Sequence, residues 1–253
     1  MTIKILYTRI VNLTLFIHTH IVILTLKEVI KITSQKRVMP NGKELMKNSQ
    51  VDFRLWGMLQ TMSYLSPDKI RFVYKQHEKY GKLTQQHLTD LYNNQTGDDS
   101  ISLSTMKRRL KAFKELEMLA EGVVTDNKSK NVKAFILLQN FETFEYIELD
   151  TLEYLLHTAT TNVLKVYIYL LGRYIFTQKN QEKYSFTLAE VAENIGLKDY
   201  NNGNTSLIRD CLNSLMAVGL LECKQYYQTT SEGMPTPRLR LVCVNKTYNK
   251  TAI

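Results

Sequence analysis

The first clear hydrophobic pattern lies over residues 51–65, where apolar residues recur every three positions. That spacing predicts a helix with one buried stripe. The stripe consists of Phe53, Trp56, Leu59 and Met62. Pro67 suits the first turn of another helix, so we expect a second helix over residues 68–80 with Gly81 at its C-terminal end.

Two further helices are predicted next. Thr84 is placed to cap the first of them, and Ser104 or Thr105 to cap the second, which we expect to end at Glu121-Gly122. The inward-facing residues are Leu88 and Leu91 in the first helix, and Met106, Leu110, Phe113 and Leu116 in the second.

A β-hairpin is expected after these helices. Val123-Val124 and residues 132–138 have strand composition, and the polar turn 125–131 joins them. Helices, then a helix–turn–helix pair, then a hairpin is the order of a winged helix, in which the second helix of the pair reads DNA and the hairpin is the wing. This predicts a winged-helix domain over residues 46–140.

The same order of elements recurs over residues 141–248, which predicts a second winged-helix domain. A short strand is expected at 145–148, then a helix capped by Asp150, and then a buried central helix that begins at Thr161 or Asn162. Its tyrosines, such as Tyr167, Tyr169 and Tyr174, are most simply core residues.

Two constant offsets relate the halves. Thr187 follows Thr84 by 103 residues, and an apolar triad repeats after 102 residues. The triad is Leu110, Phe113 and Leu116 in the first half, and Leu212, Leu215 and Val218 in the second. Gly219 closes the second triad's helix, and residues 220–228 and 238–244 form a second hairpin pattern. Such internal repetition is stronger evidence than either half alone.

Four segments carry a family resemblance: LDTLEYLL, NVLKVYIYLLGRYIF, YSFTLAEVAENIGL and TSLIRDCLNSLMAVGLLECKQYY. They resemble winged-helix modules of replication-initiation proteins from low-GC Gram-positive bacteria, their plasmids and phages, including DnaD-type primosomal proteins. The tandem pattern over residues 51–244 is similar to plasmid initiators built from two winged helices. The resemblance implies an α+β, mostly helical fold of two tandem winged helix–turn–helix domains, and binding to origin DNA.

The charge of the chain agrees with a polyanionic partner. Its 253 residues carry a formal net charge of +9, with a pI near 9.3. Residues 1–50 hold 8 Lys and Arg against 2 Asp and Glu, residues 51–140 hold 14 against 10, and residues 141–253 hold 11 against 12. The excess therefore lies in the first 140 residues.

The first predicted reader helix concentrates this charge, because residues 104–114 contain no acid. We expect it to bind duplex DNA through its cations, through hydroxyls at its start, and through lysines of the wing. The residues are Ser104, Thr105, Lys107, Arg108, Arg109, Lys111, Lys114, Lys128 and Lys130.

The second predicted reader helix is nearly neutral. It holds Arg209 beside Asp210, with Asn204 and Thr205 as further groups that could read bases or phosphates, and Arg238 lies on the following hairpin. We expect this module either to contact DNA or to mediate dimerisation or partner docking.

Residues 1–45 do not fit the rest of the pattern. Ile10 to Leu26 form an uncharged, β-branched run at the lower length limit of a membrane span. Three interpretations stand: a start at Met39 or Met46 with translated upstream sequence before it, a membrane-facing anchor, or a soluble strand pair. The pair His18 and His20 has no third ligand nearby, so no metal site is expected.

Catalytic motifs are absent, since the chain has no P-loop, no GxSxG or HExxH sequence and no Rossmann glycine run. Three cysteines without CxxC spacing indicate reduced thiols in a cytoplasmic protein. The sequence favours a non-enzymatic origin-binding protein without cofactor or small-molecule substrate. Its partners would be double-stranded DNA, host replication proteins and a second copy of the chain. A winged-helix transcription regulator and a protein-interaction module without DNA binding are the alternatives.

Overall fold

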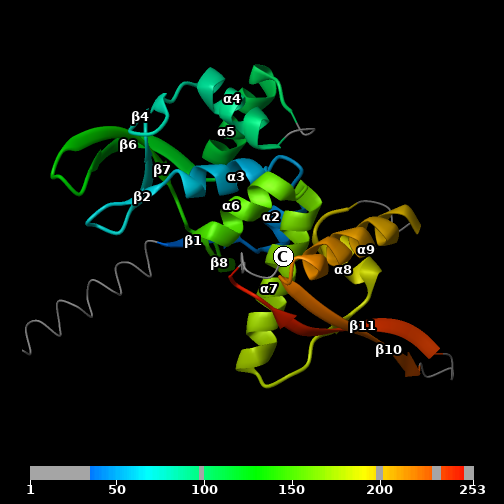
Figure 1. The fold of residues 1–253 in the computed structure, drawn as a ribbon. Coiled ribbons are helices and arrows are strands. Elements are labelled where there is room, and N and C mark those ends of the chain that lie inside the picture. The colour runs from blue at the N-terminus through cyan, green and yellow to red at the C-terminus, as the bar shows by residue number, and fades with distance from the viewer. Residues whose placement is uncertain (1–34, 97–99, 198–201, 230–234, 248–253) are drawn as a thin grey trace, which may run out of the picture. The chain divides into compact units, whose positions relative to one another are not determined.

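The computed structural model describes residues 35–96, 100–197, 202–229 and 235–247, and the fold is α+β (Figure 1). Residues 37–253 form one compact unit, and of the unit formed by residues 1–36 only the last two residues are described. In the larger unit, helix α3 (Phe53–Thr61) packs on both α6 (Leu149–Thr158) and α7 (Thr161–Lys179). One hydrophobic cluster takes residues from both predicted domains.

The predicted stripe of α3 is confirmed, because Phe53, Trp56, Leu59 and Met62 are all buried. The helix begins at Asp52, whose carboxylate accepts hydrogen bonds from the backbone N–H groups of Arg54 and Leu55. Trp56 Nε1 donates to the Val38 carbonyl at 3.0 Å and so joins α3 to strand β1 (Lys36–Pro40). Met39 of that strand is fully buried.

The predicted helix over residues 68–80 is wrong, since this segment forms strands. They are β2 (Tyr64–Leu65), β3 (Arg71–Tyr74), β4 (Gln76–His77) and β5 (Gly81–Lys82). Phe72 and Val73 are both buried although they point to opposite faces of β3. The RFVY run is therefore a strand buried on both faces, and β2 and β7 pair with its two edges. Gly81, with φ of 67°, serves the β4–β5 turn.

The first helix pair consists of α4 (Gln85–Thr96) and α5 (Leu103–Glu115). Thr84 caps α4 as predicted, with its Oγ1 accepting from His87 N at 3.1 Å. Leu88 is buried as predicted, but the other buried hydrophobic residue of α4 is Tyr92, and Leu91 is half-buried. The cap of α5 is Ser102, not Ser104 or Thr105, and the helix ends at Glu115, before the expected Glu121-Gly122.

The predicted first hairpin is confirmed as β6 (Leu119–Thr125) and β7 (Asn131–Leu137). The sheet order is β2-β3-β7-β6, so β3 lies beside the second strand of the hairpin. Strands β4 and β5 pair with each other and form a separate two-stranded sheet.

The second half has the order α7, then β9 (Ser185–Phe186), α8 (Leu188–Asn194), α9 (Asn202–Ala217), β10 (Leu221–Thr229) and β11 (Pro235–Val244). Here β9 directly precedes the helix pair, whereas β4 and β5 lie between β3 and α4 in the first half. Its sheet order, β10-β11-β9, places β9 beside the second hairpin strand, as β3 lies beside β7 in the first half. Thr187 caps α8 through Glu190 N at 3.1 Å, as Thr84 caps α4. Leu212 and Leu215 are buried like Leu110 and Phe113.

Strand β8 (Phe144–Glu148) confirms the short strand expected before α6 and pairs with β1. The N-cap of α6 is Glu148 rather than Asp150, which lies in the first turn. α7 is buried along most of its length and is capped by Thr160. The short helix α2 (Lys43–Lys47) follows β1 and packs against α8.

Two sequence expectations lie outside the described residues: those for Ile10 to Leu26 and for the His18 and His20 pair. In the described part of the chain, no helix is long and apolar enough to cross a membrane, and no three His, Cys, Asp or Glu side chains cluster as metal ligands. All three cysteines are free thiols. In the register of the second hairpin, Cys223 lies opposite Leu241 and Cys243 opposite Glu222.

Candidate nucleic-acid interface

Helix α5 separates a buried face from a cationic face. Met106, Leu110 and Phe113 are buried against the core, which fixes the rotation of the helix about its axis. The opposite surface is exposed and holds four cations. They are Lys107, Arg108, Lys111 and Lys114.

Lys107 and Arg108 are available for a ligand. Neither makes a hydrogen bond or an ion pair with a residue in the described part of the chain. Lys111 Nζ lies 3.4 Å from Glu115 Oε1, but both side chains are mostly exposed, and a surface pair of this kind contributes little energy. These three cations can therefore turn toward phosphate or base edges at small cost.

Lys114 is more occupied than its neighbours. Its Nζ and that of Lys75 both bind the carboxylate of Glu121 on β6, and these two hydrogen bonds hold the pKa of Glu121 below its usual value. Glu121 thus neutralises part of the charge at the C-terminal end of α5. The free charge is concentrated in the first two turns of the helix.

Arg109 faces the protein. Its Nη1 donates to Asp52 Oδ2 and to the Tyr92 hydroxyl at 3.1 Å, and its guanidinium lies 5.6 Å from the centre of the Tyr92 ring. The nearly buried Asp52 carboxylate also caps α3. The Arg109 side chain therefore fastens α5 to α3. The spacing of residues within α5 does not predict this contact, because Asp52 lies 57 residues before Arg109 in the sequence.

Hydroxyl groups gather at the start of α5. Ser102 Oγ lies 2.8 Å from Ser104 Oγ and 3.1 Å from Thr105 Oγ1, and it accepts a hydrogen bond from Thr105 N. Helix N-termini with such groups stabilise phosphate oxygens. Ser104 and Thr105 thus lie beside Lys107 and Arg108 as predicted, although neither is the cap.

The turn between β6 and β7, which is the predicted wing, is shaped by one carboxylate. Asp126 Oδ1 accepts from the backbone N–H groups of Lys128 at 2.8 Å and Lys130 at 2.9 Å, and Oδ2 accepts from the Tyr74 hydroxyl at 3.3 Å. The backbone hydrogen bond from Lys130 is the largest cause that holds the pKa of Asp126 below 3.8. The turn leaves both lysine side chains exposed, with Lys128 Nζ 3.5 Å from Glu78 Oε1.

The second predicted reader, α9, carries less free charge. Asn204 and Thr205 are half-buried and engaged with other groups, whereas Arg209 is exposed beside Asp210. Arg238 is held near β9 and α8, with Nη2 3.5 Å from the Ser185 carbonyl and 3.8 Å from Glu190 Oε2. These four predicted residues do not form one surface comparable to that of α5.

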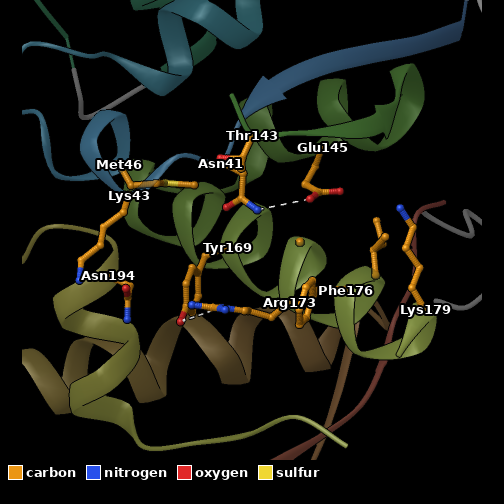
Figure 2. Close-up of a pocket in the computed structure, with 12 residues that line it drawn as sticks. Asn41, Lys43, Met46, Thr143, Glu145, Tyr169, Arg173, Phe176, Lys179 and Asn194 are labelled. Atoms are coloured by element: carbon orange, nitrogen blue, oxygen red, sulfur yellow. Dashed lines mark hydrogen bonds between the residues drawn. The ribbon is translucent and has the colours of Figure 1, made fainter. Parts of the chain in front are cut away.

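A cavity of about 390 Å³ lies between α7, β8 and the segment before α2 (Figure 2). Asn41 Nδ2 donates to Glu145 Oε1 at 3.3 Å, and burial raises the pKa of Glu145. Gly172 lies under this pair, and Arg173 packs on Tyr169, with ring centre and guanidinium 5.4 Å apart. The sequence analysis did not predict this cavity. The one signal that could have indicated it is Gly172, a glycine inside an otherwise apolar helix.

Comparison with known proteins adds no family assignment. No protein-family model matches the sequence, and neither a curated protein nor a solved structure matches it.

Proposed function

We propose that this chain is a non-enzymatic, sequence-specific duplex DNA-binding protein made of two tandem winged helices. The support is the sheet order: β3 in the first half and β9 in the second each lie beside the second hairpin strand, although the β4–β5 hairpin separates β3 from its helix pair. This neighbour relation supports the winged-helix proposal, in which the second helix of each pair enters a groove.

The observation that carries the proposal is the cationic face of α5, on which Lys107 and Arg108 have no partner among the described residues. In the proposed mechanism α5 lies in the major groove, where Arg108 can grip a guanine through two hydrogen bonds. Lys107 and Lys111 neutralise phosphates, and the wing lysines Lys128 and Lys130 follow the flanking backbone.

The test compares duplex binding by the full chain and two double variants. Lys107→Ala with Arg108→Ala should weaken binding through loss of the Arg108 base contact, and should lower the slope of log affinity against log salt by about 0.9 through loss of the one Lys107 phosphate contact. Lys179→Ala with Lys183→Ala, which removes two exposed lysines elsewhere, is the control. An unchanged slope in the first variant would remove α5 from the interface.

We further propose that the bound DNA is a replication origin of a plasmid, phage or mobile element, where the protein recruits host replication proteins. Two non-identical modules in one chain suit repeated sites better than a single palindrome. The second module either occupies the next groove or pairs two protomers. Selection of bound fragments from the source replicon tests this: tandem direct repeats favour an initiator, one palindrome beside a promoter favours a transcription regulator, and no affinity at low salt favours a protein-interaction module.

A further inference from the structure

The second hairpin extends beyond the sheet to which it belongs. β9 pairs with Leu239 and Arg240 of β11, and no third strand of the described residues pairs with residues 235–238. β10 is the outer strand of this sheet. Residues 224–229 of β10 and 235–240 of β11 are called the arm below.

One face of the arm is cationic. Lys224 lies directly opposite Arg240, and Tyr226 opposite Arg238, so these four side chains share a face. Two like charges directly opposite each other destabilise a sheet. Local rules of this kind are broken mainly where function requires it. The nearest compensation for Lys224 is Glu222, with Nζ and Oε1 3.7 Å apart and both side chains largely exposed.

Two aromatic rings accompany these charges. The Arg240 guanidinium lies 4.8 Å from the centre of the Tyr226 ring, which arranges a flat cation beside an aromatic side chain. Tyr227, on the other face, is 66% exposed and is the most exposed of the large apolar side chains of the described residues. Both tyrosines belong to β10, so an extended ligand strand that crosses the outer edge of the hairpin can contact both rings.

We propose that the arm binds an unpaired nucleic-acid strand, with bases stacked on Tyr226 and Tyr227 and phosphates on Lys224 and Arg240. Duplex DNA hides its base faces inside the helix, whereas an unpaired strand offers them to aromatic rings and its backbone to cations. The inference rests on the proposed function, in which the first module holds the adjacent duplex. One chain would then hold a duplex site and a neighbouring opened strand.

The experiment measures the affinity of the full chain for a labelled dT oligonucleotide of about 12 nucleotides, a length within the range of single-strand sites. Tyr226→Ala and Tyr227→Ala should each weaken binding by about 5- to 150-fold, which is the effect of losing one stacked base. Tyr226→Phe keeps the ring and should bind like the parent chain. Tyr146→Ala, a 49% exposed tyrosine on β8, is the matched control and should leave the affinity unchanged.

The two proposals fail separately. Lys107→Ala with Arg108→Ala should lower duplex affinity and leave dT affinity unchanged, whereas the arm variants should do the reverse. An rU oligonucleotide of the same length distinguishes the sources, because a preference for dT identifies opened DNA and a preference for rU identifies RNA, and either preference upholds the site. The proposal is overturned if both tyrosine-to-alanine variants keep the dT affinity of the parent chain, including the case in which they change only its sedimentation. It is also overturned if these variants lose duplex affinity as much as dT affinity.

Discussion

Gly172 lies in the interior of α7, where glycine disfavours a helix by about 1 kcal/mol relative to alanine. The structure explains its presence by close approach of a polar pair. A Cβ at this position would lie 1.8 Å from Asn41 Nδ2 and 2.7 Å from Glu145 Oε1. Both atoms belong to the hydrogen bond at the base of the cavity (Figure 2).

Gly172→Ala is therefore expected to lower the free energy of unfolding by about 1–3 kcal/mol, as overpacking does, even though alanine is the better helix former. Denaturant unfolding measures the change. The double variant Asn41→Ala with Gly172→Ala removes the nearer clash and should be less destabilised than the sum of the two single variants. A stabilised Gly172→Ala chain would show that the pair does not contact this helix.

The sequence predicts the roles of α5 residues only where the spacing within the helix itself determines whether they are buried or exposed. The buried positions Met106, Leu110 and Phe113 follow from spacing, and so does exposure of Lys107 and Arg108. The inward role of Arg109 does not follow, because position 109 lies at the border between the two faces. Its direction is set by the distant Asp52 and Tyr92, which the fold brings to it.

At the scale of elements, four helices of the described residues (α5, α7, α8 and α9) end in the same way. In α5, Glu117 N bonds to Lys114 O and Met118 N to Phe113 O; in α9, Gly219 N bonds to Met216 O and Leu220 N to Leu215 O. This is the Schellman motif, whose turning residue has a positive φ. Gly196 fills that position after α8, whereas α5 uses Glu117, with φ of 52°.

Glu117→Gly is expected to raise the free energy of unfolding by about 0.5–1 kcal/mol. A side chain in the left-handed region costs about 1–2 kcal/mol, and glycine removes this cost. Part of the gain is offset because glycine loses more conformational entropy on folding than glutamate does. The mirror change Gly219→Ala should cost about 1 kcal/mol through backbone strain alone, since no atom lies within 4 Å of the added Cβ. Thermal unfolding of both variants measures this. Glu115→Gly, within the last turn of α5, is the control and should destabilise.

Most helices and both hairpins could be predicted from periodicity and caps, but the segment after Pro67 could not. Its residues have apolar positions compatible with either a helix or a fully buried strand, and short apolar runs do not distinguish these. The decision belongs to tertiary pairing: β3 gains β2 on one side and β7 on the other. Lys69, with φ of 62°, makes the turn that sends the chain into β3.

The wing should depend on pH through Asp126. Its pKa is lowered in the folded protein, so the ionised carboxylate stabilises the turn at neutral pH, and this contribution is lost as the pH falls below 3.8 through the lower folded value. Nuclear magnetic resonance of the Lys128 and Lys130 amide protons should show their loss of protection in that range. Asp126→Asn keeps an acceptor oxygen without a charge, and its turn should show no such transition.

At the scale of the whole molecule, the repeat in the sequence divides the chain into two modules, but the core joins them. Arg54 of α3 donates through both terminal nitrogens to carbonyls at the end of α6, those of Leu156 and Ala159. Gly57 of α3 lets Leu156 approach, since a Cβ there would lie 3.1 Å from its Cδ2. Helix periodicity predicts which face of each helix is buried, but not that α3 of one module is buried against α6 and α7 of the other.

This shared core predicts coupled unfolding of the two modules. Leu215 is 1% exposed on α9 in the second module, and its replacement by alanine should cost about 2–5 kcal/mol. Trp56, the one tryptophan of the chain, is buried in α3 and reports on the first module. In Leu215→Ala the urea midpoint of Trp56 fluorescence should therefore fall together with that of far-ultraviolet circular dichroism. If the Trp56 midpoint stays where it is in the parent chain while the dichroism transition broadens or splits, the modules unfold independently. The positions of α5 and α9 would then be set by the linking helices alone rather than by one core.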